Sequence, residues 1–87
     1  MDNAEILARR WKYLYPVKAA AMKRQGVDLV KVAEGRIATA REEMKLLLTK
    51  LNDESREKYT DAEELEAAFV RNKRNVMSAM ERQLKYL

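Results

Sequence analysis

The chain has 87 residues and a formal net charge of +4; 47% of its residues are hydrophobic and 37% are charged. It contains no cysteine and no histidine, which excludes disulfide bonds, thiolate metal sites and the commonest general base of enzymes. Two glycines and one proline are too few for the turns of a small all-β protein. The composition therefore predicts a single all-α domain over residues 1–87, which we expect to be soluble and cytoplasmic.

The first predicted helix covers residues 3–25. One face of it collects apolar side chains if the helix continues through Pro16: Ala4, Leu7, Trp11, Leu14, Tyr15 and Met22. A proline inside a helix removes one backbone hydrogen bond and bends the chain, so we expect a kink near Pro16. The alternative is two short helices, with Pro16 in the first turn of the second. Gly26 marks the end of this segment.

The second predicted helix covers residues 28–51 and is about 36 Å long at 1.5 Å per residue. Its apolar residues follow an unbroken heptad pattern, which is typical of helices that pack side by side: Val30, Ala33, Ile37, Ala40, Met44, Leu47 and Leu51. Val32 and Leu46 fall on the opposite side of the helix. We therefore predict that the heptad residues pack within the protein, whereas Val32 and Leu46 are available to a partner.

The third predicted helix covers residues 61–86 and follows a polar connector over residues 52–60. Its packing stripe contains Leu65, Phe69, Val76 and Met80, and Val70 and Met77 lie off this stripe as further candidates for partner contacts. Asn72 interrupts the stripe. An asparagine in such a position either fixes the register of two helices or packs loosely at the helix surface.

These segments predict a three-helix bundle built on a long antiparallel hairpin of the second and third helices. In an up-down-up arrangement, the acidic start of the third helix would lie beside the basic residues of the first helix, Arg9, Arg10 and Lys12. We therefore expect a closed bundle in which these charges match.

Basic residues gather on the rear faces of the first and third helices. They are Arg9, Arg10, Lys12, Lys23, Arg71, Arg74, Arg82 and Lys85. Together with Trp11 and Tyr13, which could stack on bases, they form a candidate polyanion-binding surface. The alternative interpretation is that Trp11 belongs to the core and the charges form a solvated helix face.

Residues suited to catalysis are scarce. Glu42 and Glu43 are sequence neighbours and point about 100° apart on a helix, so they cannot converge on one substrate. Carboxylate metal sites in helical bundles use Glu-x-x-His pairs, which a chain without histidine cannot form. Both glycines stand alone, so there is no glycine-rich phosphate loop. We predict that the protein is not an enzyme and binds neither a cofactor nor a metal.

The leading functional hypothesis is a non-enzymatic, helical protein–protein interaction module: a small adaptor, a regulator or inhibitor, or an assembly subunit. Its partner would be another protein or a second copy of the chain in a homodimer. The alternative is a sequence-tolerant nucleic-acid-binding protein that uses the basic helix faces. We rank membrane binding last, because the apolar face of the first helix is short and rich in alanine.

Overall fold

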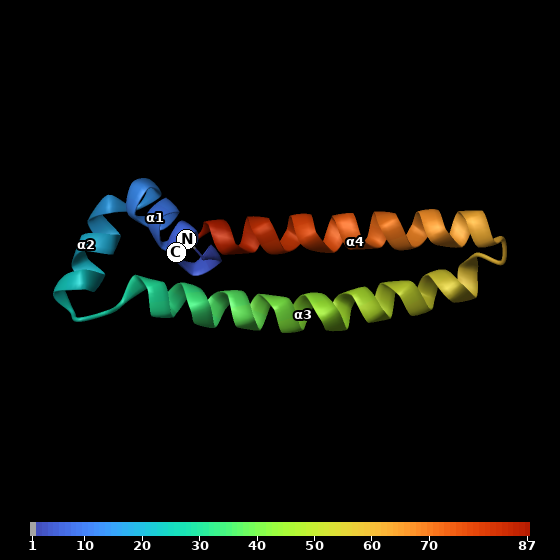
Figure 1. Ribbon diagram of the computed structural model, residues 1–87, viewed down its shortest axis with the longest axis horizontal. Helices are drawn as coiled ribbons and strands as arrows, with labels where there is room; N and C mark the ends of the chain where they lie inside the picture. The colour runs from blue at the N-terminus through green and yellow to red at the C-terminus, as the bar shows by residue number, and fades with distance from the viewer. Residues whose placement is uncertain (1) are drawn as a thin grey trace.

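The computed structural model describes residues 2–87, which form four helices and no strand. Helices α1 (Asn3–Leu14) and α2 (Pro16–Arg24) form a hook at one end of the molecule. Helices α3 (Leu29–Lys58) and α4 (Ala62–Lys85) run antiparallel and form a long hairpin (Figure 1). The fold is therefore all-α and built on the predicted hairpin, with the N-terminal segment folded across one end of it.

The N-terminal segment contains two helices rather than the single kinked helix predicted over residues 3–25. Tyr15 separates them, with φ −131° and ψ 63°. Its N–H still donates to the carbonyl oxygen of Trp11, at 2.7 Å. A proline disfavours the helical conformation of the residue before it, and Pro16 itself fits the first position of α2. The break therefore falls at Tyr15, and α2 turns away from α1 (Figure 1).

Gly26 ends α2 in a Schellman motif. The N–H of Val27 donates to the carbonyl of Met22, and the N–H of Gly26 donates to the carbonyl of Lys23, both at 3.0 Å. Gly26 adopts φ 77°, a left-handed conformation that favours glycine. Asp28 then begins α3, and its carboxylate accepts a hydrogen bond of 3.0 Å from the N–H of Val30.

Helix α3 continues through most of the predicted connector and ends at Lys58 rather than at Leu51. Residues 52–58 contain neither glycine nor proline, so no local signal stops the helix. An ion pair of 2.6 Å between Arg56 and Asp53 also lies along this last part of the helix. The chain therefore reverses over residues 59–61 alone, and the two long helices remain in contact up to the turn.

The main hydrophobic core lies at the hook end. Its buried members come from α1, α2 and the start of α3: Ala4, Leu7, Ala8, Trp11, Ala19, Leu29, Ala33 and Ile37. Within α1 they recur at intervals of three and four residues, which places them on one face. Trp11 is the largest of them and is fully buried. The hook thus covers one end of the hairpin with a small core centred on an aromatic side chain.

Three side chains from the hook and α3 bind the C-terminal end of α4. The indole N–H of Trp11 donates to the carbonyl of Leu84 at 3.0 Å. Arg36 donates to the carbonyl of Tyr86 at 2.7 Å, and Lys18 donates to the backbone oxygen of Leu87 at 2.6 Å. The last carbonyls of a helix have no partner within the helix, and positive charge is favourable at that end. These contacts therefore cap α4 and fasten the hook to it.

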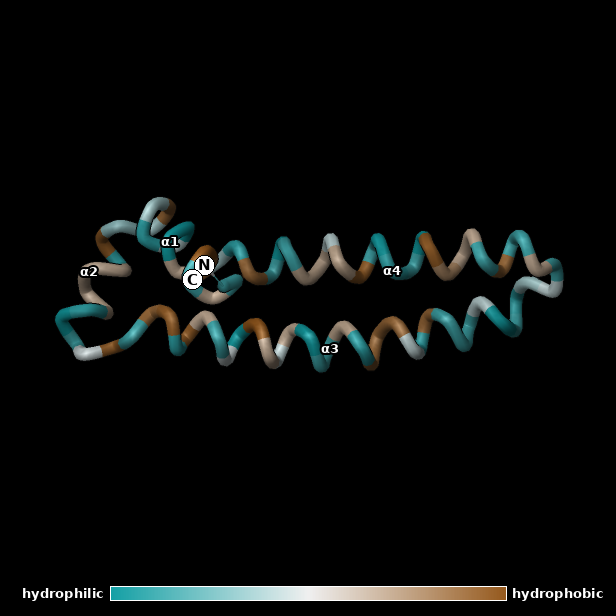
Figure 2. Tube along the Cα trace, in the orientation of Figure 1, coloured by the Kyte–Doolittle hydropathy of each residue, from teal (hydrophilic) through white to brown (hydrophobic). Residues whose placement is uncertain are grey.

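Beyond the hook, the hairpin forms an arm of two helices, which we define as residues 43–79. The molecule measures 56 × 21 × 18 Å. Its radius of gyration is 17.2 Å, whereas a compact domain of this length would have about 12 Å. Its accessible surface is 6707 Å², against about 5300 Å² for a compact monomer of this mass. Hydrophobic residues recur along both long helices (Figure 2), but only two layers are present to cover them.

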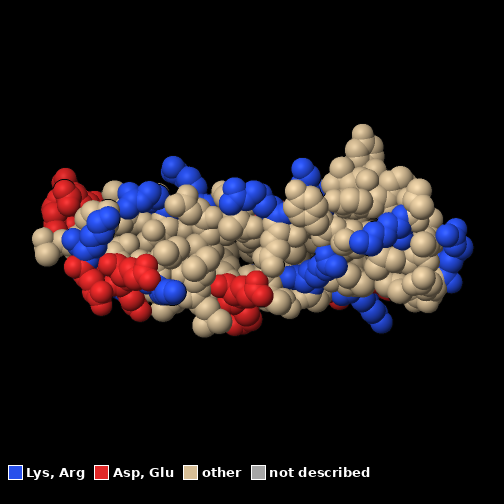
Figure 3. Space-filling model, turned by 180° about the vertical axis from the view of Figure 1, so that it is seen from behind, with Lys and Arg blue, Asp and Glu red and all other residues tan. Residues whose placement is uncertain are grey.

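The expected match between the acidic and basic segments does not occur. Acidic residues gather at the turn between α3 and α4, which lies on the left in Figure 3. Helix α1 instead packs near the other end of α4, where Trp11 contacts Leu84. Helix α1 is short, and the break at Tyr15 stops it from running along the hairpin. The acidic start of α4 therefore remains far from Arg9, Arg10 and Lys12.

We predict that replacing each of the two glycines by alanine changes the free energy of unfolding in opposite directions. A β-carbon at Gly26 or Gly35 would meet no atom of the described residues within 4 Å, so backbone conformation decides the outcome. Gly26→Ala should lower the free energy of unfolding by about 1 kcal/mol, because alanine is strained at positive φ. Gly35→Ala should raise it by about 0.5–1 kcal/mol, because Gly35 lies inside α3. Urea unfolding followed by circular dichroism measures both, and equal effects would contradict the prediction.

Trp11→Phe should lower the free energy of unfolding by about 2 kcal/mol. The substitution shrinks a buried side chain and leaves the carbonyl of Leu84 without its donor. The control is Tyr13→Phe on the same helix, at a side chain that is 86% exposed, where we expect a change within about 0.5 kcal/mol. The measurement is again urea unfolding by circular dichroism, and a Trp11→Phe variant as stable as the control would contradict it.

Candidate functional site

The arm exposes four apolar side chains along its length. Leu46 is 72% exposed, Val70 54%, Met77 45% and Leu47 43%. Val70 and Met77 are seven residues apart on α4 and therefore lie along one strip of that helix. Val32, which the sequence also predicts as a partner contact, is instead half-buried and packs against the core of the hook. The hook therefore shields part of its surface, and its role as a partner contact stays a prediction.

The predicted packing residues differ in how well they are covered. Ala33, Ile37, Ala40 and Val76 are buried. Another group is only half-buried: Val30, Met44, Leu51, Leu65, Phe69 and Met80. Leu47 is the least covered of the set. Two packed helices bury only the side chains that face the other helix, and the side chains on either side of this contact stay open to water. Half-buried side chains on the arm are therefore available for further burial by a third or fourth helix.

A buried polar layer joins α3 and α4 near the turn. The side-chain amide of Asn72 donates to the Oδ1 of Asn52 at 3.1 Å and to the Oγ of Ser55 at 3.0 Å. Asn72 and Ser55 are both buried. Sliding either helix by one turn would break both hydrogen bonds and leave buried polar atoms without partners. The arrangement thus favours the interpretation in which Asn72 fixes the register of the hairpin.

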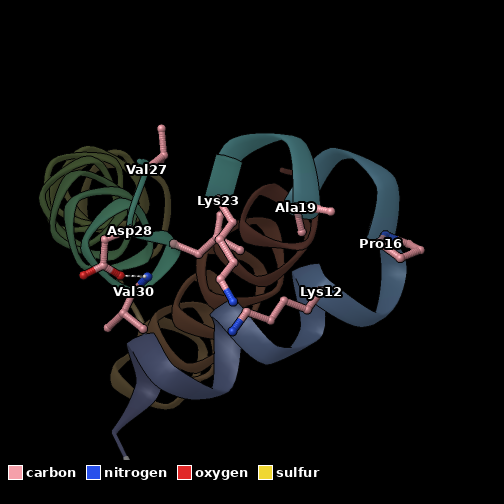
Figure 4. Close-up of a pocket in the computed structure, with 9 residues that line it drawn as sticks. Lys12, Pro16, Ala19, Lys23, Val27, Asp28 and Val30 are labelled. Carbon is pink, nitrogen blue, oxygen red and sulfur yellow. Dashed lines mark hydrogen bonds between the residues drawn. The ribbon is translucent and has the colours of Figure 1, made fainter. Parts of the chain in front are cut away.

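A hollow of about 490 Å³ lies between α2 and the start of α3. Its walls are largely apolar and include Pro16, Ala19 and Val30. Figure 4 shows the side chains of Lys12 and Lys23 extending toward the same side of this hollow. Chemically, it combines an apolar surface with two positive charges. Two of the predicted polyanion-binding residues thus come together here, although they belong to different helices.

A second group of basic residues borders a groove of about 640 Å³ between α1 and the hairpin. Arg10 comes from α1, Arg41 from α3 and Lys85 from α4, and the acidic Glu81 lies among them. Leu7 and Ile37 also line the groove. The structure therefore brings Arg10 and Lys85 together, and it adds Arg41, which the sequence analysis did not single out.

The remaining polyanion candidates do not join these two groups. Arg71 lies near the turn and donates to the hydroxyl of Tyr59 at 3.4 Å, and Arg74 lies on the arm. Arg9, Arg82 and Tyr13 are exposed. Trp11 is fully buried and stacks under the guanidinium of Arg36, whose central carbon is 5.3 Å from the ring centre. Trp11 therefore cannot stack on bases, which corrects its assignment to the polyanion-binding surface.

Among residues 2–87, no three His, Cys, Asp or Glu residues come together in a way that could hold a metal ion. No helix in this part of the chain combines the length and the apolar character needed to span a lipid bilayer. No protein-family model matches the chain, and neither a curated protein nor a solved structure matches it.

Sequence reasoning missed two kinds of residue at these surfaces. The predicted connector contains Asn52 and Ser55, although Ser55 lies four residues beyond Leu51 and so continues the same helix face. The four-residue spacing in the sequence is enough to place Ser55 on the packing face of the helix. Arg36 and Lys18 cap the end of α4. No sequence pattern could have identified them, because their role depends on where the hook docks.

Asn72→Ala should lower the free energy of unfolding by about 1–3 kcal/mol, because it leaves the buried oxygen of Ser55 and the part-buried oxygen of Asn52 without their donor. The matched control is Asn75→Ala, one turn further along α4 at an exposed position. There the better helix propensity of alanine should leave stability unchanged or raise it by about 0.5 kcal/mol. Thermal and urea unfolding of both variants measure the difference. A loss no larger for Asn72→Ala than for the control would show that the polar layer does not stabilise the hairpin.

Proposed function

We propose that this protein is a non-enzymatic interaction module that binds other helices along the flanks of its arm. In this role it acts as a small adaptor, a regulator or an assembly subunit. The observation that carries the proposal is the group of exposed apolar side chains on an arm only two helices thick. Leu46 and Val70 are both more than half exposed there. At the other end the hook packs on the hairpin, although Tyr13 and Val17 are themselves exposed there.

The physical reason is the incomplete core of the arm. Each large apolar side chain that moves from water into an interface contributes about 1.5–3 kcal/mol. A partner helix laid along α4 would contact Val70 and Met77 together, since helices dock through side chains spaced three, four or seven residues apart. The arm is also well suited to presenting such a surface, because the buried layer around Asn72 holds its two helices in one register.

The distribution of positive charge favours this proposal over nucleic-acid binding. The basic residues form two separate groups, one around Lys12 and Lys23 and the other around Arg10 and Lys85. Glu81 lies inside the second group. The aromatic side chain best suited to stacking, Trp11, is buried. A continuous basic track with accessible aromatic side chains is what sequence-tolerant binding of single strands uses.

The proposal predicts that partner binding depends on the arm and not on the hook. A tagged full-length chain, returned to extracts of its native source, should recover a stoichiometric partner protein. The double variant Val70→Gln, Met77→Gln should recover at least about tenfold less of it, because losing two apolar contacts costs more than 1.4 kcal/mol. Quantitative mass spectrometry of the recovered material provides the measurement.

The matched control places the same polar side chain on the hook, as Val17→Gln, at a position that is 80% exposed. This variant should recover the partner as well as the unmodified chain does. All three chains should show the same helical circular dichroism, since exposed substitutions change stability by about 0.5 kcal/mol or less. Equal recovery by the arm variant and the unmodified chain would refute the proposal. Recovery of nucleic acid that is lost in high salt would favour the alternative.

A further inference from the structure

The charges of α4 change sign along its first half. Asp61, Glu63, Glu64 and Glu66 come first, and Arg71, Lys73 and Arg74 follow. Between them lies an uncharged segment, residues 67–70, which ends at the exposed Val70. Glu66, Val70 and Arg74 are spaced four residues apart, so they form one ridge on the surface of the helix. This ridge has a negative end, an apolar centre and a positive end.

The chain does not neutralise this ridge by itself. Among residues 2–87 there are two ion pairs, Lys45–Glu42 and Arg56–Asp53, and both lie within α3. Helix α1, which carries basic residues, docks near Leu84 at the opposite end of α4. The acidic turn in Figure 3 therefore faces water together with the basic segment that follows it. Both charged segments are therefore free to meet complementary charge on another molecule.

A ridge of this kind is complementary to itself when two copies run antiparallel. With a two-fold axis at Val70, Glu66 of each copy lies beside Arg74 of the other, and the two Val70 side chains meet on the axis. We propose that the arm binds a second copy of this chain in this way, as a symmetric antiparallel homodimer. This inference rests on the proposed function, because it names the helix that the arm binds.

The size of the exposed surface agrees with such a dimer. The chain exposes 6707 Å², which is about 1400 Å² more than a compact monomer of its mass. A stable interface of standard size buries about 800 Å² on each partner. The excess surface of the chain is larger than the area that such an interface requires. Pairing two arms would also bury Val70 at the centre of the interface, with charged residues around it, as is common in protein interfaces.

The absence of cysteine from the sequence allows a clean cross-linking test. Two cysteines form a disulfide only when their α-carbons come within about 7 Å. In the proposed dimer, Val70→Cys lies on the axis and should cross-link to itself under mild oxidation. Met77→Cys lies seven residues from the axis, so its two copies would be about 21 Å apart and should remain uncross-linked. Non-reducing electrophoresis of the full chain distinguishes the two variants.

Each other pattern would overturn the proposal. Cross-linking of both variants would indicate a parallel dimer, and cross-linking of neither, together with a monomeric mass in sedimentation equilibrium, would show that the chain does not self-associate through α4. In that last case the proposed function still stands if the Val70→Gln, Met77→Gln variant loses its captured partner. If that variant retains both the dimer and the captured partner, the proposed function is refuted together with this inference; if it loses only the dimer, the arm binds a second copy of the chain and the captured partner binds elsewhere.

A charge exchange tests the orientation independently of disulfides. Glu66→Arg places two like charges together at each end of the ridge, so the dimer dissociation constant should rise at least about tenfold. Combining it with Arg74→Glu restores opposite charges and should bring the constant back to near its original value. The control, Glu81→Arg, lies outside the proposed contact and should leave it unchanged. Failure of the double variant to recover would overturn the antiparallel pairing. Sedimentation equilibrium measures all four chains.

Discussion

The fold depends on the burial of one side chain, Trp11, between the hook and the hairpin. Its ring fills the core of the hook end, and its N–H binds the carbonyl of Leu84, 73 residues further along the chain. This contact determines the end of the hairpin on which α1 and α2 pack. The other end consists of α3 and α4 alone. The exposed arm, the unmatched acidic turn and the long shape of the molecule all follow from where this indole docks.

The two ends of the hairpin are stabilised by different kinds of interaction. Near the hook, apolar side chains from three helices surround Trp11, and dispersion and hydrophobic burial dominate. Near the turn, Asn72, Asn52 and Ser55 form a polar layer, and Arg56 stacks 5.1 Å above the ring of Phe69. Hydrogen bonds contribute less net stability than apolar burial does, but they are directional. The hook end is thus held mainly by apolar burial, while the polar layer defines the alignment of the arm.

The sequence predicts the hairpin because the heptad pattern from Val30 to Leu51 has a single physical explanation, a long helix packed along another. It could not locate the end of α3, because residues 52–58 are as polar as a loop and yet contain no helix breaker. The exposure of Leu46, Val70 and Met77 follows from their positions on the helical wheel. Their role in binding stays a prediction. The fate of Trp11 was not predictable, since an aromatic residue among basic ones fits a core and a binding surface equally well.

The long separation between Trp11 and Leu84 also affects how the protein is made. During translation the chain emerges from its N-terminus at about 5–20 residues per second, and segments fold as they appear. The hydrogen bond from Trp11 cannot form until residue 84 has left the ribosome, so the indole N–H remains for several seconds without its acceptor, although the hook can already pack on the start of α3. The hairpin, whose helices are joined by only three residues, closes through local contacts and needs no such delay. The hairpin of the nascent chain therefore begins to close before the hydrogen bond between Trp11 and Leu84 can form.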